Sequence, residues 1–505
     1  MLRSFSYKCL DWMSCSYYNT CMPLTKSQFL TFLDSPLHLW ADVHGKLDDR
    51  KFSVYDQLIA KQGYEVEALA KQFLEQKVRR EYPAGSTVSF QYQLIDGNYQ
   101  AKIDALVHDV QNDTYDLYEI KSSTKLDKQH KYDATFQHLI AKSALPVHTT
   151  FVVHVNSEYV KDGEIDLDEF FSVNDMSEIV SKLEDEVFRL RAQALEVMNL
   201  TEPPLDVHCS KPKTCPCQQL CHPNISQYPV YDLSWWKVGQ YEKLVANGYH
   251  NLNEIPETEE LNPKQILQIR SIKTGQPIID QIGIQRELGN LVFPLYFLDY
   301  ETFGPAIPVF DGYKPYQHIV FQYSLHVMAD KNATQLQHFE FLMTEKTEPS
   351  EQLVSALLQV IGSTGSVIVW NKNFECKRNE ELAVLQPMYA DELLSINERV
   401  FDLMDIFMDG LYVDCRFHGS ASIKKVLPIL VPDLSYSGME IGEGATAMTK
   451  WWEMVNGEGT KNKNFGIKKQ SIAWALLKYC ELDTLAMVEI WKKLHVILAF
   501  AGKQS

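Results

Sequence analysis

Apolar and polar residues along this chain form short segments, each with the spacing of a helix or a strand. The most informative is residues 295–303, where four apolar or aromatic residues lead into Asp299 and Glu301. A short run of this kind predicts a buried strand, and residues two apart on a strand project from the same face. The pattern therefore predicts two neighbouring carboxylates at the end of a core strand. A cation would relieve their repulsion, although a lone pair of this kind is more typical of a strand end that turns into solvent.

Segments nearer the N-terminus predict a second group of elements. Apolar residues at helical spacing over residues 63–78 predict an amphipathic helix that carries Glu65 and Glu67. An Asp-Gly pair then marks a hairpin turn between two strands. The expected strands cover residues 88–95, 99–108, 115–121 and 149–155, with a helix over 132–143 before the last of them. A long helix is expected over residues 174–200, with Asn174 as its N-cap.

Charged residues gather on the central strands of this group. Asp104 lies on the second strand, and alternation along the third places Glu119 and Lys121 on one face. The following helix carries Asp133-x-x-x-Gln137. This order of elements and residues resembles the PD-(D/E)XK nuclease fold, in its RecB-like and CRISPR-associated exonuclease branch.

The resemblance implies a catalytic role for each of these residues. It implies that Lys121 positions or activates the attacking water and that Gln137 completes the site. On the first helix Glu67 is preferred over Glu65 as the acidic residue. Carboxylate oxygens suit Mg²⁺ or Mn²⁺, and such ions supply the nucleophile and stabilise phosphate charge. The expected ligands of this first metal site are Glu67, Asp104 and Glu119.

Four cysteines lie within thirteen residues: Cys209, Cys215, Cys217 and Cys221. Thiols this close together predict zinc or an iron–sulfur cluster. In the nucleases that this half of the chain resembles, three such cysteines and a fourth in an upstream Cys-Pro pair hold a [4Fe-4S] cluster. The upstream position here is Ser35, before Pro36. Three alternatives follow: Cys217 replaces the missing ligand, the metal is zinc, or the site is lost.

The pattern from residue 234 to residue 285 is helical and reads as a connector. Beyond the strand that carries Asp299, strands are expected over residues 319–327, 338–343 and 367–375, the last of which ends in polar residues. Helices are expected over residues 353–361, 422–427 and 478–487, and a further helix ends near Leu385. On the helix over 478–487, Tyr479 and Asp483 lie one turn apart on one face.

Three motifs in this last part occur in a characteristic order. Asp299-x-Glu301 comes first, Asn371-x-x-Phe374 followed by an acid comes second, and Tyr479-x-x-x-Asp483 comes third. The order resembles that of the DEDD 3'-5' exonucleases of the tyrosine subtype, which have an RNase H-like fold. The resemblance implies that two Mg²⁺ ions about 4 Å apart clamp the attacking and leaving oxygens, while Tyr479 orients the attacking water. The expected ligands of this second site are Asp299, Glu301, Glu375 and Asp483.

One residue departs from the second motif. Glu375 stands where an aspartate is usual, and its side chain is one methylene longer. Its carboxylate therefore reaches the metal differently, or Asp402 replaces it as a ligand. Glu375 as a charge that stabilises a helix N-terminus is an equally good interpretation.

The whole chain resembles an uncharacterised bacterial family that joins a RecB-like nuclease to such an exonuclease. The expected fold class is α/β, with a PD-(D/E)XK restriction-endonuclease-like domain, a helical connector and an RNase H-like domain. The expected boundaries are residues 1–21 (an N-terminal extension), 22–200 (nuclease-like), 201–225 (cysteine-rich), 226–290 (connector) and 291–500 (exonuclease).

Composition limits the remaining possibilities. The chain has 505 residues, 45% of them apolar and 23% charged, which is typical of a globular protein with several domains. A net charge of -18 argues against a protein that coats nucleic acid, but it is compatible with an enzyme that gathers carboxylates around metal ions. No apolar run reaches the roughly 20 residues of a membrane span, and no secretory signal is recognised. We expect a cytoplasmic nuclease that acts on nucleic acid, with DNA favoured over RNA. The alternative is a nucleic-acid-binding or protein-binding scaffold in which one or both sites are inactive.

Overall fold

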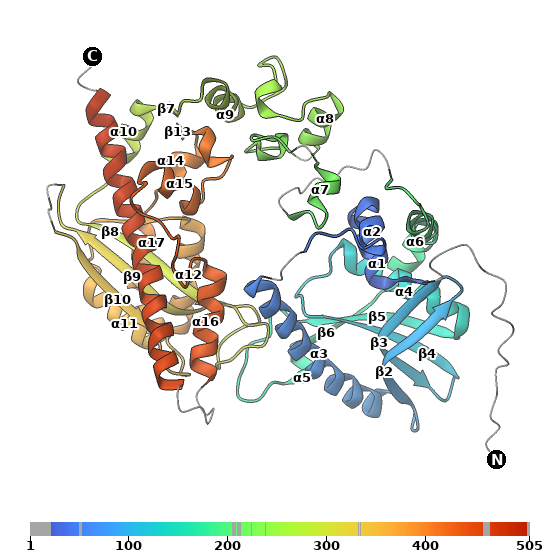
Figure 1. Cartoon of the computed structure of the whole chain (residues 1–505). Coiled ribbons are helices and arrows are strands. Elements are labelled where there is room, and N and C mark those ends of the chain that lie inside the picture. The colour runs from blue at the N-terminus through green and yellow to red at the C-terminus, as the bar shows by residue number, and fades with distance from the viewer. Residues whose placement is uncertain are drawn as a thin grey trace.

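The computed structural model describes residues 22–49, 53–204, 209, 214–223, 225–237, 239–331, 333, 335–457 and 465–501. The expected N-terminal extension over residues 1–21 lies outside these ranges. The chain forms two large mixed sheets, each covered by helices on both faces, and a helical segment between them (Figure 1). None of the helices in the described ranges combines the length and the apolar character that crossing a membrane requires.

The first sheet has six strands, and every strand expected in this part of the sequence is present. β3 pairs antiparallel with both β2 and β4, β4 pairs parallel with β5, and β5 pairs antiparallel with β6. The path is β1 (Leu24–Thr25), β3 (Tyr99–Asp109), β4 (Thr114–Lys121), β5 (Val147–Val155) and β6 (Phe171–Asp175), with β2 (Thr87–Asp96) on β3.

Side-chain alternation gives this sheet two apolar faces. Leu106 and Leu117 face one core, which α1, α4 and α6 complete, whereas Val107 and Tyr118 face another core, which α3 completes. The helices of this half are α1 (Lys26–Asp34), α2 (Pro36–Val43), α3 (Val54–Glu81), α4 (Lys128–Ala144), α5 (Leu167–Phe170) and α6 (Ser177–Met198).

The start of the long helix α6 differs from the expectation. Asn174 is not its N-cap but lies in β6, where it pairs with Val152 of β5, and the helix begins only at Ser177. The prediction was wrong because the strand is short and its pairing with β5 is a tertiary contact. An asparagine that could cap a helix can also lie in an edge strand, so Asn174 alone does not distinguish the two.

The connector is largely helical, as the sequence predicts. It has a small apolar core around Leu233, Leu252 and Ile269. Its elements are η2 (Val230–Asp232), α8 (Gln240–Ala246), η3 (Leu252–Glu254), α9 (Pro263–Thr274), β7 (Ile278–Ile279) and α10 (Gln281–Gly289), and α7 (Gln218–Cys221) precedes them in the cysteine-rich segment. β7 pairs antiparallel with β13 (Tyr412–Val413).

The second sheet has five strands, with the carboxylate-bearing strand at its centre. β8 pairs antiparallel with β9 and parallel with β11. The order is β10 (Gln337–Leu342), β9 (Ile319–Met328), β8 (Leu295–Phe303), β11 (Ser366–Val369) and β12 (Val400–Asp402). β8 and β9 are buried along most of their length because helices pack on both faces.

The helices around this sheet place the remaining motifs. One face packs on α11 and on the pair α12 and α13, and the other on the long α17. These helices and the short elements near them are α11 (Ser350–Val360), α12 (Lys372–Leu385), η4 (Pro387–Tyr389), α13 (Ala390–Glu398), α14 (Asp405–Met408), η5 (Cys415–Phe417), α15 (Ile423–Leu430), α16 (Gly444–Asn456) and α17 (Phe465–Ala501).

The two halves contact each other directly. Leu58 of α3 shares an apolar cluster with Phe303 and Trp451 of the second half. The Tyr316 hydroxyl donates a hydrogen bond to the carbonyl oxygen of Ser122, at 2.6 Å. In Figure 1 the green connector runs above this contact from one half to the other. A loop of the second half thus lies beside the strand end that carries Lys121.

Candidate active sites

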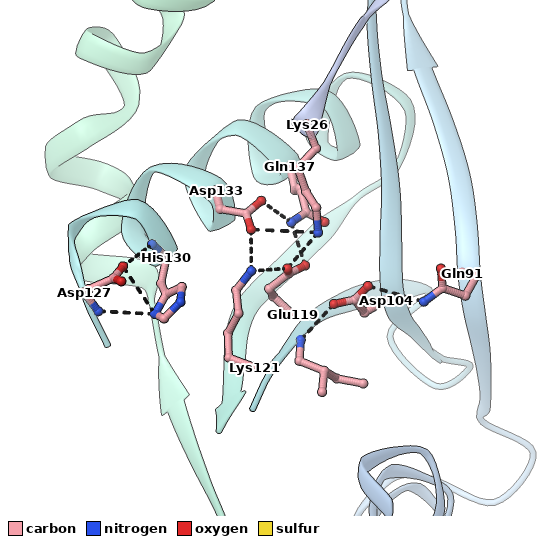
Figure 2. Close-up of polar contacts among 10 residues, drawn as sticks. Lys26, Gln91, Asp104, Glu119, Lys121, Asp127, His130, Asp133 and Gln137 are labelled. Atoms are coloured by element: carbon pink, nitrogen blue, oxygen red, sulfur yellow. Dashed lines mark hydrogen bonds and ion pairs between the residues drawn. The ribbon is translucent and has the colours of Figure 1, made fainter. Parts of the chain in front are cut away.

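Four polar side chains of β4 and α4 form one hydrogen-bonded group (Figure 2). The Lys121 ammonium donates to Glu119 Oε1 at 2.7 Å and to Asp133 Oδ2 at 2.6 Å. The Gln137 amide donates to Glu119 Oε2 at 2.6 Å and to Asp133 Oδ1 at 2.8 Å. One lysine and one amide thus bridge two buried carboxylates. The structure brings together all the residues that the sequence analysis placed on this strand and helix.

A second ammonium group reaches the same carboxylates from α1. Lys26 Nζ lies 2.7 Å from Glu119 Oε1 and 3.8 Å from Asp133 Oδ2. Sequence reasoning missed this lysine, which is 93 residues from Glu119. The only local signal is its place in the first turn of a helix, where the helix dipole disfavours a positive charge unless acidic residues lie nearby.

Asp104 and Glu67 lie at the side of this group and are linked through Gln91. The Gln91 amide donates to Glu67 Oε1 at 3.0 Å and lies 3.4 Å from Asp104 Oδ1. Glu65 instead lies 4.0 Å from Lys61 on the exposed side of α3. Of the two acids on this helix, Glu67 is therefore the one beside the strand residues.

The carboxylates of this first site differ in charge state. Burial, reinforced by the charge of Glu119, raises the pKa of Asp104 to about 7. The same two causes raise the pKa of Asp133 to about 6. Burial also raises the pKa of Glu119, but Lys121 and Lys26 outweigh it and hold that pKa below its usual range. Glu119 is thus ionised without a metal, and its charge is balanced by the two lysines.

A second carboxylate group lies at the end of β8. One ligand atom each of Asp299, Glu301 and Cys480 lie within 4.8 Å of one another. Asp483 is one turn further along α17, and its Oδ1 accepts a hydrogen bond from the Tyr436 hydroxyl at 2.5 Å. The strand end and the helix thus bring the first and third sequence motifs together.

Burial has the largest effect on the pKa values of this second group, and repulsion between carboxylates adds to it. Burial, then the charge of Asp483, raises the pKa of Asp299 well above its usual value. Glu301 is affected in the same way by burial and by Asp299. Burial raises the pKa of Asp483 to about 6, although hydrogen bonds from Tyr436 and Tyr479 and the charge of Lys424 oppose the shift. Oxygen donors that lack matching cations are a good fit for hard divalent metal ions.

Glu375 joins this group from the first turn of α12. Its side chain is 2% exposed, and its Oε2 is buried with no hydrogen-bond partner among the described residues. Burial and then the charges of Asp299 and Glu301 raise its pKa well above the usual value. The longer side chain is therefore near enough to the two carboxylates of β8 for their charges to act on it.

Asp402, the alternative to Glu375, has a different environment. Its carboxylate accepts hydrogen bonds from the backbone N–H groups of Asn371 at 3.1 Å, Lys372 at 2.7 Å and Met404 at 3.0 Å. These bonds hold the N-terminus of α12, where Asn371 has the left-handed φ of 100°. Asp402 thus fixes the helix that carries Glu375.

Tyr479 lies beside the same carboxylates, together with two residues that no motif indicates. Lys424 Nζ is 5.4 Å from the centroid of the Tyr479 ring and 5.6 Å from that of Tyr436. Lys424 is followed by Lys425 in the sequence, but no motif links it to this site. Tyr436 lies in a loop with no periodic pattern. Both reach the site through tertiary packing alone.

The described cysteines of the cluster also come together. Ligand atoms of Cys215, Cys217 and Cys221 lie within 4.8 Å of one another, and those of Cys209 and His222 are grouped with Cys215 in the same way. Burial raises the pKa of Cys215 to about 12, so a cation is needed to make this group a thiolate at neutral pH. His38 of α2, which the sequence analysis did not consider, is also within 4.8 Å of these three sulfurs.

Comparisons with known proteins match parts of the chain. The sequence pattern of a family described as a domain of unknown function (DUF2779) matches residues 296–422, which include β8 and the start of α12. The uncharacterized protein MG366 homolog of Mycoplasma pneumoniae is 31% identical over 216 residues, which are 38% of this chain and 31% of that protein. The uncharacterized protein MG366 of Mycoplasma genitalium is 29% identical over 214 residues, with the same coverage of each chain. The matched region thus spans less than a third of the length of each relative.

A solved structure also matches part of the chain. An alkaline exonuclease (LHK-Exo) from Laribacter hongkongensis matches 35% of this chain and 94% of its own, at 13% sequence identity. The TM-score is 0.21, which is too low to establish a common fold.

Proposed function

We propose that this protein is a metal-dependent nuclease that hydrolyses phosphodiester bonds at two active sites. DNA is the favoured substrate over RNA, and cleavage proceeds from chain ends. The first site belongs to a PD-(D/E)XK-like domain over residues 22–200. The second belongs to an RNase H-like domain over residues 291–500.

The observation that carries this proposal is the gathering of four carboxylates on β8, α12 and α17, three of them buried. Burial and the charges of neighbouring carboxylates raise the pKa values of Asp299, Glu301 and Glu375, and burial raises that of Asp483. One oxygen of Glu375 has no hydrogen-bond partner among the described residues. Burying charges of one sign together is costly unless a cation binds them. A fold maintains such a cluster when it holds divalent ions for catalysis.

The two sheets support the same interpretation. In the second sheet the order β10-β9-β8-β11-β12, with β9 antiparallel to its neighbours, fits an RNase H-like domain. In the first sheet, Glu119 and Lys121 on β4 contact Asp133 and Gln137 of α4, and Gln91 links Asp104 on β3 to Glu67 of α3. That arrangement fits the nuclease fold which the first half of the sequence resembles.

In each site, one residue positions the water and another holds the carboxylates in place. Divalent ions held by the carboxylates of either site would supply a bound hydroxide and stabilise the charge on the phosphate. In the first site Lys121 holds the attacking water, while Gln137 keeps Glu119 and Asp133 in position. In the second site Tyr479 orients the water, and Tyr436 fixes Asp483 through its hydrogen bond.

The second candidate function is a scaffold that binds nucleic acid or protein without cleaving it. Two departures from the nuclease patterns favour this alternative: Ser35 replaces an upstream cysteine, and Glu375 replaces an aspartate. The buried position of Glu375 next to Asp299 and Glu301 argues against it, because a decayed site has no reason to keep the repulsion.

The test uses the purified full-length chain and end-labelled single- and double-stranded DNA and RNA, with Mg²⁺, Mn²⁺ or EDTA. We expect metal-dependent shortening of at least one substrate. Lys121→Ala should remove one part of the activity, Asp299→Ala the other, and the double variant all of it. Binding without cleavage in every metal would favour the scaffold instead.

A further inference from the structure

His38 lies in the cysteine cluster at the position of a metal ligand. It belongs to α2, more than 170 residues before the cysteines, and its side chain is 2% exposed. Its Nε2 is 3.5 Å from Cys215 Sγ. The Sγ atoms of Cys217 and Cys221 are also 3.5 Å apart, and the ligand atoms of all four residues lie within 4.8 Å of one another.

These separations match the ligands of one tetrahedral ion. Zinc binds sulfur at about 2.3 Å and histidine nitrogen at about 2.0–2.1 Å. Tetrahedral angles then put two sulfurs about 3.8 Å apart, and a sulfur and a nitrogen about 3.6 Å apart. A four-iron cluster instead binds each cysteine to a different iron atom, so its ligands stand around a larger body and lie further from one another. The short separations between these ligand atoms therefore do not fit the [4Fe-4S] cluster that the resemblance implies.

The other nitrogen of His38 is held as the histidine of a metal site requires. Its Nδ1 lies 2.8 Å from Asp34 Oδ2, one turn earlier in the chain. A carboxylate that accepts the Nδ1 proton fixes the tautomer with its lone pair on Nε2, the atom that faces Cys215. Ser35, where the related nucleases have their upstream cysteine, has a buried hydroxyl with no hydrogen-bond partner among the described residues. His38 lies three residues after Ser35, in the first turn of α2.

We propose that the chain binds one structural zinc ion through His38, Cys215, Cys217 and Cys221. The ion joins α2 to the segment over residues 214–222, which otherwise contact through Leu37, Trp40 and the cysteines themselves. Cys209 is in contact with His38 and Cys221 and forms a second group with Cys215 and His222. We place it outside the four ligands because its sulfur is not grouped with all four of them within 4.8 Å. This inference concerns a site separate from both carboxylate groups and does not depend on the proposed nuclease activity.

The test measures the metal content and the cobalt spectrum of the full-length chain, purified without oxygen. We expect about one zinc per chain, no iron–sulfur absorption, and intense visible bands of tetrahedral Co²⁺ after metal exchange. His38→Ala should lower zinc affinity by more than 100-fold, whereas His38→Cys should retain zinc and shift the cobalt bands toward those of an all-sulfur site. Asp34→Asn should weaken binding roughly 10–100-fold.

Cys209→Ser is the matched control, since this thiol is next to the site but outside the proposed set. It should retain one zinc and an unchanged cobalt spectrum. Iron with inorganic sulfide in the native protein would overturn the proposal. Zinc that stays bound with unchanged affinity in His38→Ala would also overturn it, as would a native protein that binds neither metal.

Discussion

The two carboxylate sites differ in charge: lysines neutralise the carboxylates of the first, whereas carboxylates outnumber nearby cations in the second. In the first, Glu119 and Asp133 lie against the ammonium groups of Lys121 and Lys26. In the second, four carboxylates have Lys424 and Arg378 as the nearby charges that oppose their mutual repulsion. A metal entering the first site competes with lysines, whereas a metal entering the second relieves repulsion. We therefore expect the second site to depend more strongly on divalent ions for both its activity and its stability.

The largest effect should follow from removing a ligand of the second site. Asp299→Ala and Glu375→Ala should each slow 3'-end trimming by about 10³-fold, because losing a metal ligand removes several kcal/mol of transition-state stabilisation. Asp402→Asn should keep trimming and lower only the unfolding temperature, since Asp402 holds backbone N–H groups. Trimming rates under single-turnover conditions check this. If Asp402→Asn loses trimming and Glu375→Ala keeps it, the two residues have exchanged roles.

The next effect concerns Lys121 in the first site. Lys121→Ala should reduce one cleavage activity by about 10²–10³-fold, because it removes the group that positions the water. It should leave trimming by the second site unchanged. Lys125→Ala is the matched control, a lysine on the neighbouring exposed loop. Assays on each substrate class distinguish the two activities, and full activity of Lys121→Ala on all of them would refute the assignment of this site.

A third effect is on stability and its pH dependence in metal-free protein. The pKa of Asp483 is raised from 3.8 to about 6, so its contribution to stability is fully present below about pH 4 and is lost as pH rises through about 6. The loss is on the order of 3 kcal/mol, at about 1.4 kcal/mol per pKa unit. With EDTA, the stability of the wild type should therefore fall relative to Asp483→Asn between pH 4 and pH 7.

Urea unfolding at several pH values measures this difference, because contributions from groups outside this carboxylate cluster largely cancel between the two proteins. Added Mg²⁺ should restore the wild type at neutral pH and have little effect on Asp483→Asn. An equal response of both proteins to pH and to Mg²⁺ would show that Asp483 does not share a repulsive metal site with its neighbours.

The residues that sequence reasoning found are those that lie close together within one element. Glu119 and Lys121 are two apart on a strand, and Tyr479 and Asp483 are four apart on a helix. Such spacings determine which side chains share a face. The strands and helices that carry these motifs were predicted for the same reason, since each has its own apolar period. Only their ends differed, as at Asn174.

The residues that sequence reasoning missed come from elements far from their partners in the chain. Lys26 reaches Glu119 across 93 residues, and His38 reaches Cys215 across 177. Neither has a local pattern that distinguishes it from other helix residues. The choice between Glu375 and Asp402 likewise depended on how α12 meets β12, which is a tertiary contact. A single sequence thus predicts candidate residues of a site but not the partners that balance their charge.

The smallest effect we predict separates the two tyrosines of the second site. Tyr479→Phe should slow trimming by about 10-fold, because it removes a hydroxyl that orients the water and leaves every carboxylate in place. Tyr436→Phe removes the hydrogen bond to Asp483 Oδ1, so it should chiefly raise the Mg²⁺ concentration that half-maximal trimming requires. Rates measured across a Mg²⁺ titration distinguish these effects. A Mg²⁺ shift in Tyr479→Phe, with a simple rate loss in Tyr436→Phe, would assign the water to Tyr436. The second site would then differ from the first in a further way, because the residue that positions its water would lie outside every sequence motif.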